Sequence, residues 1–454
     1  NKFALLHGQS VNPAPLEDAK SRVFGTFFGT GIDRDGAVVT PASFARFNSR
    51  GRSFDSDLED YLSSIAGRFI LLLDTGAKTR VYRDPMGHMP LFFNPDTGLA
   101  GSSISLTIDR PVTGNTACAK PGSDPASAKS FFPMGQTVDR DVRLLPGNHL
   151  LDLSDMTARR TWPLRKSIRK VTAAKSAPVM DKIAARLRDI VQGWIATDDV
   201  VLPLDASAGS RILMAAAGDM RGDLAQITVL QQGDAGDAKP RAVAQNMTEA
   251  VGVPLTPLTR DAAIATLGGG RPQRVERKRL FWLRTSSAMR IRTQDAYAID
   301  ALQPSQHIVL NASGLDALQG GWQAGGPKPK PIRASLTAQI EATLGFKPEK
   351  PVRTAVEEDY TRWKSTLPKT LQDAAEDFIR IELHEPPKAV ITLGHAEHVH
   401  ASPFSDRTVI ELALKLPLSL RSSPKFAEAL IEALDPALAG LPYDAPLMEP
   451  AAAE

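Results

Sequence analysis

The chain has 454 residues, enough for two domains, and its 42% hydrophobic and 23% charged residues are typical of a soluble globular protein. The net charge of +3 is too small to indicate a nucleic-acid or membrane partner, and a single cysteine, Cys118, excludes an internal disulfide framework. No apolar run approaches the ~20 residues that span a bilayer, and the N-terminus shows no signal-peptide pattern. We therefore expect a cytoplasmic protein without a membrane partner.

The first third of the sequence is β-rich. Short apolar runs alternate with Gly, Asp, Asn and Pro turns from residue 3 to residue 153. The segment at 143–153 predicts a turn and the last strand of this region, and the basic stretch at 164–177 predicts a linker. We expect the preceding strands at residues 69–74, 79–83 and 90–93, the first two joined by a turn at 75–78.

The second half alternates between helix and strand. An apolar stripe predicts a helix that begins near Ser176 and contains Ile183, Leu187, Ile190, Val191 and Trp194. Further helices are expected at 242–251 and at 357–384, the latter interrupted at Pro368. Strands are expected at 200–204, 227–230 and 307–310. This alternation favours an α/β fold with a doubly wound, mainly parallel sheet, whose ligands bind at the carboxyl ends of the strands.

One stretch, residues 200–217, stands out from the rest. It reads V-V-L-P-L-D-A-S-A-G-S-R-I-L-M-A-A-A, a short apolar strand, a turn of small residues and the start of an apolar helix. In α/β proteins such a turn can present backbone N–H groups and a helix N-terminus to an anion. The alternative is a plain strand and helix whose small residues serve close packing.

Several motifs follow one another along the chain. They read G-R-F-I-L at 67–71, Y-R-D-P-M-G-H-M-P-L-F-F at 82–93, L-L-P-G-N-H at 144–149 with Trp162, and P-F-S-D-R at 403–407 with Leu416-Pro417. With these motifs, in this order, the chain resembles asparagine synthetase and its relatives, including β-lactam synthetase and the lasso-peptide cyclases.

The resemblance implies two domains. Residues 1–165 would form a class-II glutamine amidotransferase-like domain, an Ntn-type αββα sandwich, and residues 175–450 a synthetase domain of the adenine-nucleotide α-hydrolase type. The synthetase domain would use ATP and Mg²⁺ to adenylate a carboxylate, and an amine would then displace AMP. Family glutaminases need an N-terminal cysteine as nucleophile, whereas this sequence begins Asn1-Lys2-Phe3, which implies an inactive glutaminase.

The resemblance also locates two nucleotide loops. The family motif S-G-G-x-D-S falls on residues 205–210, where Ser210 is retained and the Mg²⁺-binding Asp is replaced by Gly209. The motif S-G-D-G-G-D-E-L-F-G-G falls on 311–321, where an Asp and the Glu are replaced by Ser313 and Ala317. The candidate site residues are Asp205, Ser207, Ser210 and Gly314 for the nucleotide, Asp205 and Asp316 for the metal, and Lys425 for catalysis.

Two further clusters suggest ligands. Eight basic residues against one acid indicate either an anionic partner or a solvated helix face, and they are Arg271, Arg274, Arg277, Lys278, Arg279, Arg284, Arg290 and Arg292. The sequence H-A-E-H-V-H at 395–400 would place His398 and His400 on one face of a strand, where they could bind a metal. A loop histidine cluster without a metal is the alternative.

Three functional hypotheses follow. In the first, both active sites have degenerated and the protein is a binding or scaffolding partner, beside an active paralogue in a biosynthetic assembly. In the second, it is a working ATP-dependent amide ligase in which Asp205 and Asp316 hold Mg²⁺ and Lys425 assists. In the third, it is an anion- or nucleic-acid-binding protein that uses the basic stretch at 271–292.

Overall fold

The structure, a computed structural model, describes residues 4–6, 13–115, 132–164, 168–231, 238–259, 307–320, 347, 349–393 and 398–443. The first part of the chain forms two antiparallel sheets, a six-stranded one in the order β1-β2-β3-β4-β8-β9 and a three-stranded one in the order β6-β5-β7. Their strands are β1 (Ala14–Glu17), β2 (Val23–Ile32), β3 (Ala66–Asp74), β4 (Thr79–Arg83), β5 (Phe92–Asn94), β6 (Leu99–Gly101), β7 (Arg143–Leu144), β8 (His149–Asp152) and β9 (Thr157–Arg160). The helical segments here are α1 (Phe54–Ser63) and the short 3₁₀ turns η1 (Pro41–Phe44), η2 (Ile104–Leu106) and η5 (Pro133–Gly135).

Apolar side chains on both faces of β3 explain how the sheets stack. Phe69, Leu71 and Leu73 are buried in a cluster with residues of α1, whereas Leu72 faces the other way, into a cluster that contains Phe93 of β5. The strands predicted at 69–74 and 79–83 are confirmed as β3 and β4, which pair from Asp74 opposite Thr79. Because successive side chains of β3 point to opposite faces, one face packs on the helix α1 and the other on the second sheet.

Two strand predictions need correction. The strand expected at 90–93 is Phe92–Asn94, and it belongs to the small sheet rather than to the sheet of β3 and β4. The segment at 143–153 holds two strands, β7 and β8, because Pro146 and the left-handed Asn148 (φ 57°) break the run between them. It is also not the last strand. The edge strand β9 follows, and its polar, mostly exposed sequence T-A-R-R carries no apolar pattern to predict it.

A five-stranded parallel sheet in the order β12-β11-β10-β13-β14 forms the centre of the second part of the chain. Its strands are β10 (Val200–Leu204), β11 (Gln226–Gln231), β12 (Thr256–Thr259), β13 (Ile308–Leu310) and β14 (Val399–Ala401). The parallel arrangement predicted from sequence is confirmed. The predicted helix after Ser176 is also confirmed, because the whole predicted stripe is buried on α2 (Ala177–Ile195).

The helices of the second part include one long region, 350–393, that packs on the small antiparallel sheet. Its first helix starts earlier than predicted, at Lys350, and ends before Pro368 as expected. Val356 and Val390 of this region are buried with Phe92 and Leu144, so helices from the second half cover the outer face of that sheet. The helical segments are α3 (Ala208–Ala217), η7 (Gly218–Asp223), α4 (Ala238–Val251), α8 (Leu315–Gln319), α10 (Lys350–Thr366), η10 (Lys369–Ala374), α11 (Ala375–Ile379), η11 (Arg380–His384), α12 (Glu385–Leu393), α13 (Arg407–Lys415), α14 (Leu418–Arg421), α15 (Pro424–Leu434) and α16 (Pro436–Ala439), and η6 (Ala173–Lys175) precedes α2.

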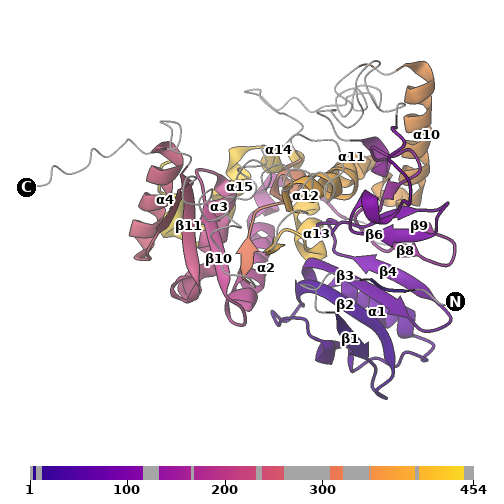
Figure 1. The fold of residues 1–454 in the computed structure, drawn as a ribbon. Helices are drawn as coiled ribbons and strands as arrows, with labels where there is room; N and C mark the ends of the chain where they lie inside the picture. Colours follow the sequence, from indigo (N-terminus) through magenta and orange to yellow (C-terminus); the bar gives the residue numbers. More distant parts are fainter. Residues whose placement is uncertain are drawn as a thin grey trace, which may run out of the picture.

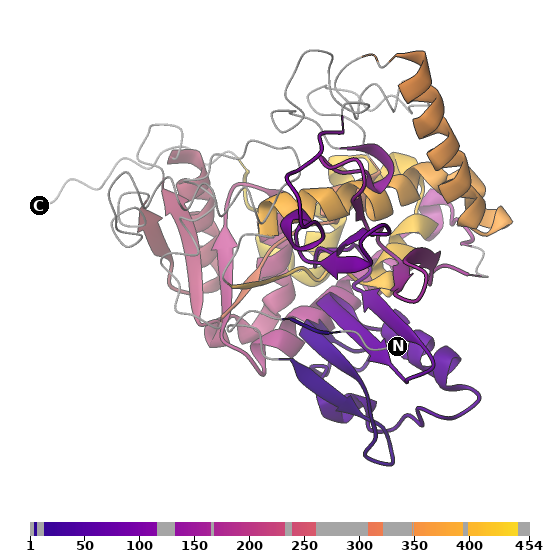
Figure 2. The same ribbon diagram turned by 45° about the vertical axis from the view of Figure 1, so that its right-hand side comes forward.

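One apolar cluster contains residues of both sheet systems. In Figures 1 and 2 the parallel sheet lies at one side and the N-terminal antiparallel sheet at the other, with α11, α12 and α13 between them. Ile32, Ala66 and Met86 of the first half are buried in the same cluster as Leu310 and Phe404 of the second. The predicted domain boundary at 165–175 therefore stays a prediction, since the core continues across it. No helix in the described ranges is long and apolar enough to cross a membrane.

Candidate functional site

The strand order of the parallel sheet identifies one edge as the place to look for a ligand. From β10 the chain moves outward to β11 and β12, and then returns to the other side of β10 with β13 and β14. Ligands of open α/β sheets bind at such a reversal, outside the carboxyl ends of the two central strands. The loops that leave β10 and β13 there are 205–207 and 311–314, the two segments that the sequence predicted as nucleotide loops.

The first loop is closed by its own side chains. The Asp205 carboxylate accepts hydrogen bonds at Oδ1 from the backbone N–H of Ser207 (2.8 Å) and from the hydroxyl of Ser210 (2.7 Å). The Ser207 hydroxyl accepts from the backbone N–H of Ser210 (3.3 Å) and so caps α3. A phosphate cradle needs such N–H groups to point at the anion, but these two already have acceptors within the loop.

There is no room for a side chain at Gly209, the position at which the resemblance places a metal-binding Asp. A Cβ atom built on Gly209 would lie 2.5 Å from the Cβ of Ala312, on the loop that follows β13. The first turn of α3 and the second loop therefore touch at the point where the carboxylate would have to project. Restoring the Asp would require the loops to separate.

Arg211, the cation beside this loop, already has partners of its own. Arg211 is buried, and its guanidinium donates to the carbonyl oxygens of Leu441 (2.6 Å) and Pro442 (2.9 Å) and lies over the ring of Tyr443, 3.8 Å from its centre. Burial lowers the pKa of Arg211, and Tyr443 offsets part of this effect. Arg211 thus fastens the C-terminal segment to α3.

The second loop is hydrogen-bonded to β14 and lies against Met86 of the first half. Asn311 accepts from the backbone N–H of Ser313 (2.9 Å) and donates to the carbonyl of Ala401 (3.2 Å). Gly314 has a φ of 93°, and any Cβ there would collide with the sulfur of Met86. A glycine is required here by the left-handed turn and by the close approach of Met86.

Asp316 pairs with a lysine. Its side chain is 81% exposed at the start of α8 and lies 3.4 Å from the Nζ of Lys388, which is also 3.4 Å from Glu385. Burial lowers the pKa of Lys388, but Glu385 and Asp316 more than compensate, so that this pKa is raised. Lys388 was missed at the sequence level because it lies 72 residues from Asp316 and belongs to no motif.

Lys425, His398 and His400, the other candidate residues, form no metal site with the two loops among the described residues. Lys425 is exposed in the first turn of α15, and His400 lies in β14 with His398 just before it. Within the described parts of the chain, no group of three or more His, Cys, Asp or Glu side chains could hold a metal ion. Asn1, Cys118, His395 and the basic stretch at 271–292 lie outside the described residues.

The motifs that carry the family resemblance meet at the contact between the two halves. Asp84 accepts from the backbone N–H groups of His88 (2.7 Å) and Met89 (2.8 Å) and from the hydroxyl of Ser405 (3.2 Å). Asp406, fully buried, accepts from Arg186 (2.9 Å) and caps α13 through the N–H of Val409 (2.7 Å). These residues stabilise the interface.

Two more buried charges complete this interface. Arg407 donates to Asn148 (2.9 Å) and to the carbonyl of Leu62 (2.9 Å), and burial lowers its pKa to about 10 although Asp84 and Asp406 oppose the shift. Glu382 accepts from Arg160 (2.7 Å) and from the indole N–H of Trp363 (3.0 Å). The sequence motifs were identified, but Glu382 was missed because the residues around it in the sequence form no recognisable motif.

A comparison of the chain with models of known protein families finds no match, and a comparison with curated proteins finds none either. The family relationship is therefore a proposal that rests on the motifs and on the loop positions described above.

Proposed function

We propose that this chain is an asparagine-synthetase-like protein whose synthetase site no longer performs ATP chemistry. It would act instead as a binding or scaffolding partner in a biosynthetic assembly, beside an active paralogue. The observation that carries the proposal is the state of the loop after β10. The Asp205 carboxylate accepts from an N–H group that a phosphate would need, and the contact between Gly209 and Ala312 fills the place of a metal ligand.

The stacking of sheets and helices supports a more specific fold for each half of the chain. A helix layer, two antiparallel sheets and a covering helix layer agree with an αββα sandwich of the Ntn type. The parallel order with its reversal beside β10 agrees with a doubly wound sheet of the adenine-nucleotide α-hydrolase type. Both assignments belong to the same proposal, since each rests on topology together with the sequence motifs.

Electrostatics supports the loss of ATP binding. Asp205 places a negative charge at the loop where phosphates would carry more, and such an arrangement is repulsive unless a metal ion lies between them. Asp316, the other candidate metal ligand, is paired with Lys388. A lysine at that carboxylate disfavours a divalent cation there.

An ATP-dependent amide ligase is the rival function, and one observation favours it. Both candidate loops lie at the strand-order reversal, where α/β enzymes bind nucleotides. In that case Asp205 would have to turn away from Ser207 and Asp316 away from Lys388 to reach a metal. The ligase thus requires a rearranged site.

Thermal unfolding with and without ligand separates the two functions. A ligand at 100 times its Kd stabilises a protein by about 2.7 kcal/mol, which raises the Tm measurably. We expect millimolar Mg-ATP to leave the Tm unchanged, with ATP alone and Mg²⁺ alone as controls. A Mg²⁺-dependent rise in Tm, together with pyrophosphate release on addition of a carboxylate substrate, would establish the ligase.

A further inference from the structure

Arg211, in the first turn of α3, is a buried cation without a carboxylate partner among the described residues. It is only 1% exposed, and burial lowers the pKa of its guanidinium, an effect that Tyr443 opposes. By contrast, the buried Arg186 lies 2.9 Å from the carboxylate of Asp406. Glu428, exposed on α15, acts on the pKa of Tyr443 but forms no ion pair with Arg211 in the described chain. A buried charge is costly unless it is paired, so this guanidinium favours an anionic partner.

Two consecutive carbonyl groups take the place of an anion at this guanidinium. Nη1 of Arg211 donates to the carbonyl oxygen of Leu441 (2.6 Å), and Nη2 donates to that of Pro442 (2.9 Å). A third carbonyl, that of Leu438, lies 3.5 Å from Nη1, whereas the buried Nε atom has no acceptor among the described residues. Arginine binds the two oxygens of a carboxylate or phosphate with the same pair of donors, and a bond to a charged acceptor is about twice as strong as one to a neutral acceptor. An oxyanion is therefore the better partner for these donors.

The segment that supplies the two carbonyls, residues 441–443, is a thin cover, and we call it the strap. Pro442 is exposed, and Leu441 and Tyr443 are only partly buried, so little protein separates the guanidinium from solvent on this side. The ring of Tyr443 lies over the guanidinium, 3.8 Å from ring centre to Cζ, and Leu441 and Tyr443 pack at the border of the largest apolar cluster. The strap is thus held through Arg211 and two partly buried side chains.

The chain before the strap is anchored independently of it. Leu438 of α16 is fully buried, and Asp435 at the start of this helix forms an ion pair with Arg221. Gly440 follows the helix, and a Cβ atom built on it would meet no atom within 4 Å. Glycine tolerates a wide range of backbone angles, so the strap can move at Gly440 while α16 stays in place.

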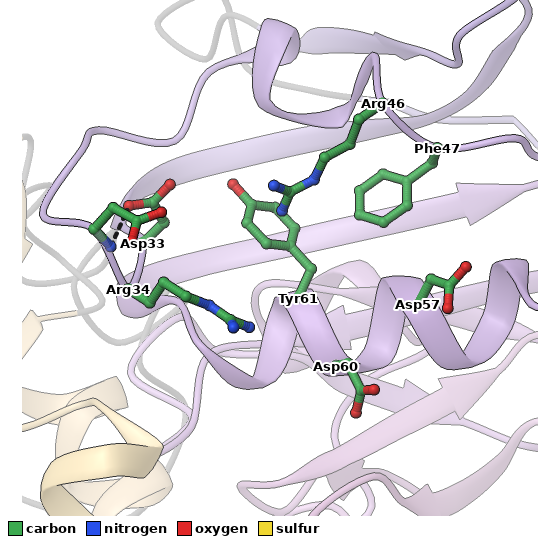
Figure 3. Close-up of a pocket in the computed structure, with 8 residues that line it drawn as sticks. Asp33, Arg34, Arg46, Phe47, Asp57, Asp60 and Tyr61 are labelled. Atoms are coloured by element: carbon green, nitrogen blue, oxygen red, sulfur yellow. Dashed lines mark hydrogen bonds between the residues drawn. The ribbon is translucent and has the colours of Figure 1, made fainter.

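A second contact between an arginine and a tyrosine shows why the absence of acids at Arg211 matters. Figure 3 shows Arg46 beside Tyr61, and its guanidinium lies 4.1 Å from the centre of the ring. Four carboxylates line the same cleft, Asp57 and Asp60 among them. Their negative charge repels an oxyanion. Arg46 is therefore disfavoured as an anion site, whereas Arg211 is not.

We propose that Arg211 is an oxyanion-binding site that the strap covers. An incoming phosphate or carboxylate group accepts hydrogen bonds from Nη1 and Nη2 in place of the two carbonyls, and the strap swings away at Gly440. The strap thus competes with the anion for the same donors. The proposal goes beyond the scaffold function and does not depend on it, because it rests on the Arg211 side chain and the strap rather than on the loops after β10 and β13.

Titration calorimetry of the full chain with inorganic phosphate, and separately with acetate, measures this competition. Tyr443→Ala removes the ring that lies over the guanidinium, and we expect it to raise the affinity for the anion by roughly 2- to 30-fold, the range of one cation–π contact. Tyr443→Phe keeps the ring and is the matched control, which should bind as the unmodified chain does. The gain should disappear when Arg211→Met is added to Tyr443→Ala. Preference for phosphate or for acetate identifies the natural ligand as a phosphoryl or a carboxylate group.

A second readout follows the strap itself. Phosphate should speed chymotryptic cleavage after Tyr443 in the unmodified chain, measured by mass spectrometry, whereas sodium chloride at the same ionic strength should not. Three results would overturn the proposal: equal affinities of Tyr443→Ala and Tyr443→Phe for both anions, a gain that survives Arg211→Met, and a cleavage rate that phosphate leaves unchanged. The comparison of the two Tyr443 variants stays decisive if Arg211→Met does not fold, since both keep the arginine.

Discussion

Among single residues, Asp205 is the side chain that closes the loop after β10. Its carboxylate holds the N–H of Ser207 at 2.8 Å and the hydroxyl of Ser210 at 2.7 Å. The carboxylate thus occupies the position in which a phosphate oxygen would accept the same hydrogen bonds. Replacing it should both loosen the loop and free its donors.

We expect Asp205→Ala to destabilise the protein by about 1 kcal/mol, the usual net contribution of one or two such hydrogen bonds. The same substitution should raise the affinity for pyrophosphate by roughly 10-fold, because it removes a repulsive charge and frees the N–H of Ser207. Calorimetric titration of pyrophosphate measures this change. Asp219→Ala, an exposed acid after α3, controls for net charge. Equal gains in the two variants would contradict the role given to Asp205.

His149 predicts a pH dependence of stability. It is buried and hydrogen-bonded to the carbonyl of Gly147 at 2.7 Å, and burial lowers its pKa to about 4. A histidine in the unfolded chain titrates near pH 6.5. Between these values the unfolded state binds more protons, so the free energy of unfolding should fall as the pH decreases from 6.5 towards 4.

Urea unfolding at several pH values checks this expectation. His149→Gln should flatten the dependence between pH 4.5 and 6.5 by up to about 1.4 kcal/mol per pH unit, the contribution of one proton. Carboxylates contribute mainly below this window. Parallel curves for the variant and the unmodified chain would show that His149 is already protonated in the native state.

At the scale of elements, α13 joins the two halves through its N-terminus. Asp406 caps the helix and pairs with Arg186 of α2, whose side chain also donates to the carbonyls of Asp33 (2.7 Å) and Ser64 (3.2 Å). Breaking a buried ion pair by removing one partner leaves the other charge uncompensated. One residue thus stabilises a helix start, a helix pair and the contact with the first half.

We expect Asp406→Ala to lower the free energy of unfolding by about 3–5 kcal/mol. The control is Arg362→Ala, which removes an exposed partner of Asp359 and should change the stability by less than about 1 kcal/mol. Urea unfolding of both variants measures the difference. A similar loss of unfolding free energy in the two variants would show that the buried ion pair stabilises the protein no more than the exposed one.

Predictability from sequence also differed between elements. Apolar runs and periodicity predicted β3, β4, α2 and β10, because their apolar side chains are buried in the core clusters of the two halves. The edge strand β9 and the division of 143–153 between two sheets were not predictable, because polar edge residues and a Pro-Gly-Asn break carry no long-range pairing information. The helices that cover the small sheet belong to the distant region 350–393, a contact that local patterns do not encode.

At the scale of the whole molecule, the shared core predicts cooperative unfolding. Trp162 of the first half and Trp194 of α2 are buried in the same apolar cluster, and Glu382 of the second half binds Arg160 of the first. We expect one transition in urea, with the same midpoint by tryptophan fluorescence and by far-ultraviolet circular dichroism. Two separate transitions would indicate that the halves unfold independently.

The sequence predicted the strand, turn and helix at 200–217 correctly, whereas what the candidate loops bind stays a prediction. The turn at 205–207 lies beside the reversal in the strand order of the sheet. The inward turn of Asp205, the contact of Gly209 with Ala312 and the pairing of Asp316 with Lys388 depend on residues up to about a hundred positions apart, so only the folded structure reveals them.

We propose that the loops at the ends of β10 and β13 do not bind Mg-ATP. Isothermal titration of ATP into the full chain, with excess Mg²⁺, tests this proposal. We predict no saturable heat up to millimolar nucleotide. Saturable, Mg²⁺-dependent binding that is lost in Asp316→Asn would contradict the claim and establish a working nucleotide site.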